Sequence, residues 1–260
     1  MRFVEIEEAR AARGVRLVIA SNVPSPWSQG AMGVLDLKGV DYLAVRFRPA
    51  AEAVLAWTGS WNAPVAVCDD EPPRTGWAEI LALAERVGGA PSLVPTDDDA
   101  RVRLFGLTHE LLGERGLGWS VRLLLVHASL TTEGREGWPL EVGQHLAPRY
   151  GYAPERARAL ADDARARARR VLALFGRVAG DARARGHAYL LGSTPTALDV
   201  YAAVTINVVA PPPEALCPMP VPVRHAFETL DPAVRDALPD SLRAHRDLMY
   251  ERHLACPMRF

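Results

Sequence analysis

The sequence predicts an α/β domain followed by an all-helical domain. Strand and helix patterns alternate over the first 87 residues, a stretch rich in Gly, Pro and polar residues follows, and strand patterns are nearly absent beyond it. The length of 260 residues also favours two domains over a single one. We therefore expect an α/β domain over 1–87, an interdomain linker over 88–98 and a helical domain over 99–260.

The first elements alternate between short apolar runs and helical patterns. Residues 5–13 have the pattern of a charged helix, and VRLVIA at 15–20 is an apolar run of strand length. A helix is expected over 26–38, because Gly39 then occupies the usual position of a helix C-terminal glycine. Alternation at 42–47 predicts a second strand, so the chain opens with a β-α-β unit whose strands are parallel.

Three further elements complete the expected α/β domain. Part of 49–57 is expected to be helical, PVAVC at 64–68 is a strand, and 76–87 is an amphipathic helix.

A proline-rich stretch at 210–223 interrupts the helical half and is expected to wrap the surface or a pocket. The helices expected beyond the linker are roughly 100–130, 153–180, 196–209, 232–237 and 241–254.

The composition narrows the classes of function. Lys+Arg of 30 against Asp+Glu of 31 argues against a nucleic-acid partner, and an Arg/Ala-rich run at 156–170 is more typical of a solvated helix face. No apolar run is long enough to span a bilayer, and no signal peptide is recognised, so no membrane partner is expected. Cys68, Cys217 and Cys256 form neither a disulfide framework nor a metal site, which favours the reducing cytoplasm.

No metal site is predicted from the histidines. His109-Glu110 begins like a zinc-binding helix, but the required second histidine is absent, since position 113 is Gly.

Three segments carry a resemblance to a known family. SNVPSPWSQGAMGVLDLKGV at 21–40 places Ser before Pro and an aromatic residue, and NAPV at 62–65 is similar to a Val-Pro-Val segment. GSTPTALD at 192–199 contains a capping box with Thr196 at the N-cap and Asp199 at N3. In this order and spacing the segments resemble the glutathione S-transferases, and the Ser-Pro-aromatic form is most similar to the tau class. The resemblance implies a thioredoxin-like N-terminal domain and an all-helical C-terminal domain.

The resemblance also implies an enzyme that conjugates glutathione to an electrophilic small molecule, or adds and eliminates it, and that forms a homodimer. Ser25 would be the catalytic residue that stabilises the glutathione thiolate; Ser21 and Ser28 are rivals, and Ser25 before Pro26 is also a standard helix cap. Lowering a thiol pKa by two units needs about 2.7 kcal/mol. A helix N-terminus contributes about 0.3–1 kcal/mol and a hydrogen bond to a charged group about 1.5–3 kcal/mol, so either alone is marginal and the two together suffice.

Glutathione would be held by a second group of residues. Ala63 and a cis Pro64 would align its cysteinyl part. The family usually carries Glu-Ser or Gln-Ser further on to hold the γ-glutamyl group, and here Thr75 and Gly76 stand in those positions, after Arg74. The resemblance implies that these three residues contact glutathione as the co-substrate. The Lys common before the cis-proline is also absent, since Trp61 and Asn62 occupy that stretch.

The second substrate is expected at the domain boundary. Trp27, Trp119 and Arg122 are candidates for the substrate pocket, and ordinary packing between domains is the alternative for the residues of the helical half.

Two other functions stay open. The first is an isomerase or lyase of the same fold that acts on an unsaturated acid or pathway intermediate, with Arg74 receiving the substrate carboxylate. The second is a non-catalytic binding module.

Overall fold

Four strands form one mixed sheet in the computed structural model, which describes residues 1–260. The order across the sheet is β1-β3-β2-β4. β2 and β3 are parallel, with Val15 opposite Tyr42, which confirms the predicted β-α-β unit, whereas β2 and β4 are antiparallel, with Val18 opposite Val65. β1 was not expected and pairs with β3 through two residues. The strands are β1 (Arg2–Phe3), β2 (Val15–Ile19), β3 (Tyr42–Arg46) and β4 (Val65–Cys68).

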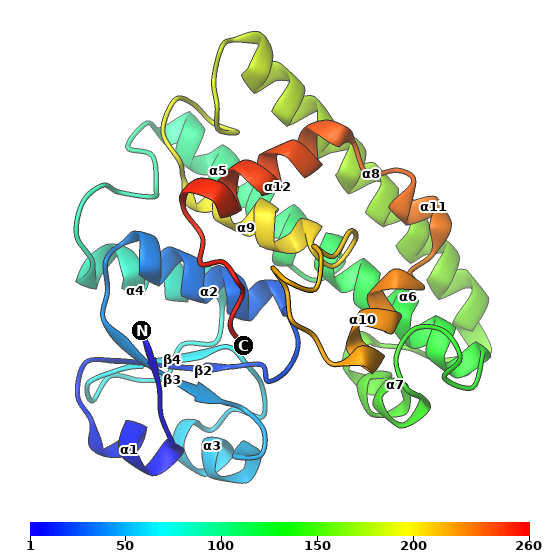
Figure 1. Cartoon of the computed structure of the whole chain (residues 1–260), viewed down its shortest axis with the longest axis horizontal. Helices are drawn as coiled ribbons and strands as arrows, with labels where there is room; N and C mark the ends of the chain where they lie inside the picture. The colour runs from blue at the N-terminus through cyan, green and yellow to red at the C-terminus, as the bar shows by residue number, and fades with distance from the viewer.

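Helices occupy both faces of the sheet and the whole second part of the chain (Figure 1). Every element expected before residue 88 is present, within two residues of its expected ends. The helices are α1 (Ile6–Ala11), α2 (Pro26–Leu37), α3 (Ala51–Thr58), α4 (Trp77–Val87), α5 (Asp98–Leu112), α6 (Leu117–Thr131), α7 (Leu140–Leu146), α8 (Ala157–Ala184), α9 (Ala197–Ile206), α10 (Val221–Glu228), α11 (Pro232–Arg235) and α12 (Asp240–Arg252), with short 3-10 turns at Pro148–Tyr150 and Pro154–Arg156.

The prediction of one helix over 100–130 was wrong, because α5 and α6 are separated by a tight turn at 113–116. A Cβ atom at Gly113 would lie 2.4 Å from the His109 ring, and one at Gly116 would lie 2.8 Å from the Glu110 carbonyl oxygen. The turn therefore requires glycine at 116, where the neighbours are backbone atoms, whereas a side chain at 113 would have to displace the exposed His109 ring.

Two helices in the second part of the chain were not expected at all. α7 follows α6 after a loop over 132–139. α10 begins within the proline-rich stretch, where Pro222 occupies one of the first two helical positions. Proline is tolerated there because the first N–H groups of a helix have no partner inside it.

The sheet has a small core on one face and a large one on the other. α1 and α3 cover the outer face in Figure 1, and the core there contains seven buried residues. On the other face, α2 and α4 lie between the sheet and the helices above it, and a core of 58 buried residues continues through them. Close packing of α2 on α9 requires Gly30, since a Cβ atom there would lie 2.7 Å from the Tyr201 ring.

The predicted capping box at the start of α9 is confirmed. Asp199 is fully buried, and its Oδ2 accepts hydrogen bonds of 2.8 Å from both the backbone N–H and the hydroxyl of Thr196. Its Oδ1 accepts a third bond of 2.8 Å from the Leu190 N–H. The Ala197 N–H donates to the carbonyl of Leu93, so the segment before α5 is anchored to the same helix start. The start of α9 therefore joins three stretches of chain, two of them through the buried Asp199 carboxylate.

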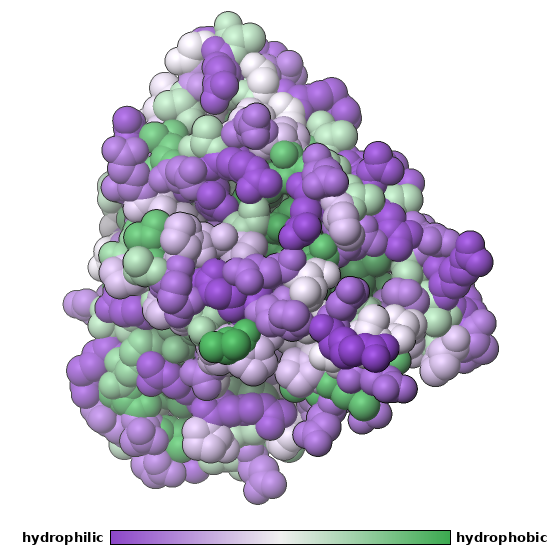
Figure 2. Space-filling model, turned by 45° about the vertical axis from the view of Figure 1, so that its right-hand side comes forward, coloured by the Kyte–Doolittle hydropathy of each residue, from purple (hydrophilic) through white to green (hydrophobic).

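The surface carries most of the charge. Figure 2 shows hydrophilic residues over most of one face, with small hydrophobic patches between them. α8 buries Ala161, Ala164, Ala168, Val171 and Leu172, and the half-buried Arg165 beside them pairs with Asp162 and Asp231 at 2.6 Å. None of the helices has both the length and the apolar character needed to cross a membrane. His, Cys, Asp and Glu side chains nowhere gather in a group of three that could hold a metal ion.

Candidate functional site

The register of the sheet brings the predicted site segments to one edge of the sheet, the one at which β2 ends and β4 begins. Val18 near the end of β2 lies opposite Val65 at the start of β4, so the loop from β2 to Ser25 and the Ala63–Pro64 peptide lie at the same edge. That peptide bond is cis, as the resemblance implies.

The segment that follows β4 returns to the same edge. Ala66 forms an antiparallel bridge with Arg74, and continuing this register places Thr75 and Gly76 beside Val65 and Pro64. The residues predicted to hold glutathione are therefore close together along one edge of the sheet, although they are spread over the first 76 positions of the chain.

Of the three candidate serines, only Ser25 has a hydroxyl without a structural partner. Ser21 is bonded to Arg48, donating to its carbonyl at 3.0 Å and accepting from its N–H at 2.8 Å. Ser28 is fully buried and accepts a bond of 3.0 Å from the Ala20 N–H. Ser25 occupies the N-cap of α2 but its side chain forms no capping bond. The structure thus leaves this hydroxyl available to a ligand.

The electrostatics at Ser25 favour an anion. α2 has 12 residues, its first turn contains no acidic side chain, and its positive dipole end lies at Ser25. Ser25 is 6% exposed, so little water competes for a hydrogen bond at this position. A negatively charged atom next to its hydroxyl would be stabilised by both the dipole and the bond.

The positions predicted to hold the rest of glutathione present backbone groups. The Ala63 N–H donates to the side chain of the neighbouring Asn62 at 2.7 Å, a local bond that a ligand can replace. Thr75 is exposed, and Gly76 is the N-cap of α4. Sequence reasoning missed Glu79, whose carboxylate accepts from the Gly76 N–H at 3.0 Å. The signal was the Gly-x-x-Glu spacing, a capping-box pattern.

Arg74 is engaged within the chain. Its guanidinium donates to the carboxylate of Glu71, which also accepts from Arg86 at 2.7 Å, and these bonds hold the pKa of Glu71 below its ordinary value. Arg74 is therefore paired with Glu71 on the segment beside β4.

Trp27 joins the start of α2 to the helical part of the chain. Its Nε1–H donates to the carbonyl of Leu112 at 2.7 Å, and a Cβ atom on Gly118 would lie 3.3 Å from its ring. The first turn of α6 therefore packs on the ring of Trp27, two residues after Ser25. Trp27 packs at this contact between the two parts of the chain and forms one wall of any pocket that opens beside it.

Arg122 is the most unusual side chain near this contact. It lies four residues after Gly118 and thus on the same face of α6, and it is 5% exposed. Its guanidinium is 4.9 Å from the ring centre of Trp138 and 5.3 Å from that of Phe227. No carboxylate pairs with it, and burial lowers its pKa. Cation–π contacts alone thus hold a buried positive charge, which is a costly arrangement.

The surroundings of Arg122 contain further polar and aromatic groups. The Trp138 Nε1–H is buried and has no acceptor. Trp119 is half-buried and packs edge-on against Tyr150, with ring centres 4.9 Å apart. Sequence reasoning missed Trp138 and Phe227, because both follow irregular stretches of chain. The signal for Arg122 was one charged residue in the apolar run of α6.

Comparisons with known proteins concern the fold. No family model and no curated protein matches the sequence. A glutathione S-transferase from Methylobacterium radiotolerans, solved with glutathione sulfonate, has a TM-score of 0.59 at 18% identity over 92% of this chain and 91% of its own. A beta-etherase from a Sphingobium species has a TM-score of 0.60 at 15% identity, over 92% of this chain and 95% of its own. A bacterial zeta-class maleylpyruvate isomerase has a TM-score of 0.50 at 19% identity, over 87% of this chain and 97% of its own.

Proposed function

We propose that this chain, which has the glutathione S-transferase fold, is a glutathione-dependent enzyme that transfers the thiol to an electrophilic small molecule, or adds and eliminates it. One observation carries the proposal. The uncommitted hydroxyl of Ser25 stands at the N-terminus of α2, at the sheet edge that also holds the cis Ala63–Pro64 peptide. Fold alone does not determine function, so the argument depends on this arrangement.

Ser25 acts on the sulfur of glutathione. Its hydroxyl donates a hydrogen bond to the thiolate, and the dipole of α2 stabilises the same charge, so the thiol ionises at neutral pH. The thiolate sulfur then forms a bond to the electrophilic carbon, and the leaving group departs with the bonding electron pair. Ser25 does not form a covalent intermediate in this scheme.

The rest of glutathione is held along the sheet edge. The backbone of Ala63 pairs with the cysteinyl unit and displaces the Asn62 side chain from its N–H. Thr75, Gly76 and the first N–H groups of α4 receive the γ-glutamyl carboxylate. Glu79 supplies a carboxylate near the γ-glutamyl ammonium, in place of the missing acidic residue. Arg74 contributes by positioning this segment through Glu71.

The second substrate binds where α2 meets α6, between Trp27, Trp119 and Arg122. The unpaired charge of Arg122 favours an anionic substrate and gives specific support to the second candidate function, an isomerase or lyase that acts on an unsaturated acid. In that function Arg122 takes the role first expected of Arg74. A matched comparison tests it: Arg122→Met should raise KM for carboxylate-bearing electrophiles far more than for neutral ones, and Arg122→Lys should restore part of the difference.

The remaining features of the proposal come from the resemblance. We propose a homodimer in the cytoplasm, with an α/β domain over 1–87, a linker over 88–98 and a helical domain over 99–260. A non-catalytic binding module is the alternative to the enzyme. It predicts that Ser25→Ala protein retains every cellular function, whereas the enzyme loses activity.

Calorimetric titration with glutathione tests the proposal. Saturable binding is expected for the native chain, with proton release that reports ionisation of the thiol. Ser25→Ala should bind with less proton release, and Ser21→Ala, whose hydroxyl is bonded to Arg48, serves as the control. Absence of binding at millimolar glutathione, or equal proton release from the native chain and Ser25→Ala, would contradict the proposal.

A further inference from the structure

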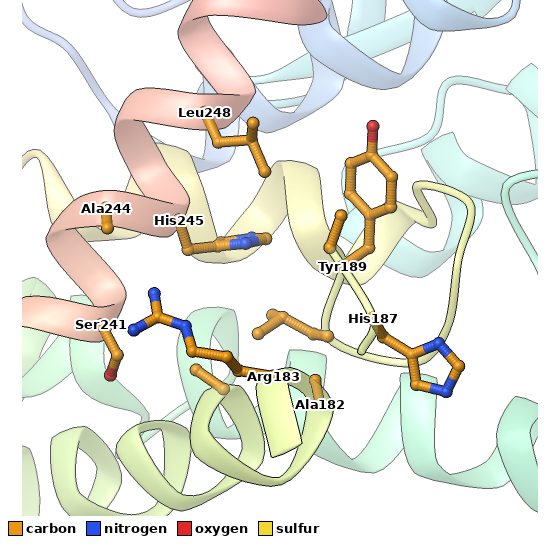
Figure 3. Close-up of a pocket in the computed structure, with 11 residues that line it drawn as sticks. Ala182, Arg183, His187, Tyr189, Ser241, Ala244, His245 and Leu248 are labelled. Atoms are coloured by element: carbon orange, nitrogen blue, oxygen red, sulfur yellow. The ribbon is translucent and has the colours of Figure 1, made fainter. Parts of the chain in front are cut away.

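A second cavity lies away from the candidate site, between the end of α8, the stretch 187–190 and α12 (Figure 3). Its volume is about 250 Å³, and none of its 11 lining residues is acidic. None of them belongs to the sheet, α2 or α6, so this cavity is separate from the proposed glutathione and electrophile sites.

Basic and polar groups form one side of the cavity. Figure 3 shows Arg183 extending from α8 toward α12, where Ser241 and His245 lie, with His187 on the opposite side. Ser241 is in the first turn of α12, a helix of 13 residues whose N-cap is Pro239 and carries no side-chain cap. Asp240 in the same first turn offsets part of the positive helix dipole, so an anion at this end of the cavity would be held mainly by the Arg183 guanidinium and the Ser241 hydroxyl.

His245 lines the cavity between Ser241 and Leu248 on α12. Its side chain is 6% exposed, and Nε2 has no hydrogen-bond partner. The nearest carboxylate oxygen, Asp199 Oδ1, is 3.4 Å from Nε2 and already accepts from the Leu190 N–H. Figure 3 shows the ring lying in the wall of the cavity. Asp199 is therefore the polar group that Nε2 faces, and the His245 ring forms part of the cavity wall without offering this nitrogen to the cavity.

The other wall is apolar. Leu190, Leu248 and the ring of Tyr189 line it, and the Tyr189 hydroxyl is bonded to His253 at 2.7 Å, so the ring is held in place. A volume of about 250 Å³ is below the usual range for ligand pockets of about 300–1,000 Å³, so the occupant must be small.

We propose that this cavity is a second binding site, for a small carboxylate that carries a compact apolar body. The carboxylate pairs with Arg183 and accepts from Ser241, and the apolar body packs on Leu190 and Leu248. The site does not depend on the proposed glutathione chemistry, since it shares no residue with it.

Titration with benzoate tests the proposal, followed by calorimetry and by the NMR signals of the His245 ring. Benzyl alcohol, which has the same ring but no charge, is the matched ligand. Benzoate should bind saturably and shift the His245 signals. Arg183→Gln should weaken benzoate binding at least tenfold, whereas Arg177→Gln, which removes an exposed arginine of the same helix outside the cavity, should leave it unchanged.

A second variant fills the cavity without removing a charge. Ala244 is an exposed residue of the lining, so Ala244→Phe should fold and should abolish benzoate binding. Ser25→Ala should bind benzoate normally, which separates this proposal from the fate of the proposed enzymatic function. Equal affinity for benzyl alcohol, unchanged affinity in both Arg183→Gln and Ala244→Phe, or no saturable binding at all would each overturn the proposal.

Discussion

Replacing Ser25 by Ala removes one hydroxyl and leaves the helix that it precedes intact. The hydroxyl forms no capping bond, so the substitution costs less than the ordinary loss of a cap, about 0.5–2 kcal/mol. In the proposed glutathione complex the same hydroxyl would donate to the thiolate, and a bond to a charged group is worth about 1.5–3 kcal/mol. Ser25→Ala should therefore change thiol ionisation strongly and stability weakly.

The effect converts into a shift of pKa. One unit corresponds to about 1.36 kcal/mol, so loss of the bond should raise the pKa of bound glutathione by about one to two units. The dipole of α2 remains in the variant, so the pKa should stay below that of the free thiol. At neutral pH the thiolate fraction and the rate of conjugation should both fall, and the rate should recover as the pH is raised.

Ultraviolet absorbance of the bound thiolate, recorded across a pH series, measures this shift directly. Ser28→Ala is the matched control, because its hydroxyl is fully buried and accepts from the Ala20 N–H. That variant should lose stability while the thiol pKa of properly folded protein stays the same. An unchanged pKa in Ser25→Ala, or a loss of stability as large as that of Ser28→Ala, would refute the reasoning.

Three further predictions concern the fold. Asp199→Ala leaves three buried donors without an acceptor, and should lower the free energy of unfolding by about 3 kcal/mol or more in urea titration. Gly30→Ala should lower the free energy of unfolding by about 1–3 kcal/mol, measured by heat or urea, because the new methyl group overlaps the Tyr201 ring. Gly106→Ala is the control: no atom lies within 4 Å of the new methyl group, so it should raise the free energy of unfolding by about 1 kcal/mol. Burial lowers the pKa of His127 below its ordinary 6.5, so the folded chain binds fewer protons than the unfolded one. Stability should therefore decline as pH falls through 6.5 toward the lower folded pKa, and His127→Gln should flatten that decline; a steeper decline in the variant would contradict this.

The elements of the α/β half could be predicted because local patterns determine them. The strands at 15–19 and 65–68 are short, mostly apolar runs buried along their whole length, and the strand at 42–46 was predicted from its alternation. α2 is bounded by Pro26 and by Gly39, which has a φ of 64°. The helical half was harder to predict. The break between α5 and α6 depends on close contacts at Gly113 and Gly116, which no periodicity in the sequence shows.

The residues of the candidate site could be named from the sequence only in part, because their hydrogen-bond partners lie far away along the chain. The sequence named Ser25, but three nearby serines were open candidates, and the choice depends on which hydroxyls the folded backbone occupies. Arg74 and Arg122 show the same limit. Both are charged residues of the sequence, and only the fold pairs the first with Glu71 and leaves the second without a carboxylate.

The resemblance implied the cis Ala63–Pro64 peptide. The sequence by itself determined the order of elements from α1 to α4, the division into an α/β part and a helical part, and the capping box at Thr196 and Asp199. These features arise from residues close together in the chain, where steric and hydrogen-bonding rules act locally. Tertiary structure decided which polar groups stay free, because a hydrogen-bond partner can come from any distance along the chain. The available hydroxyl of Ser25, the isolated charge of Arg122 and the cavity beside His245 all depend on such distant contacts.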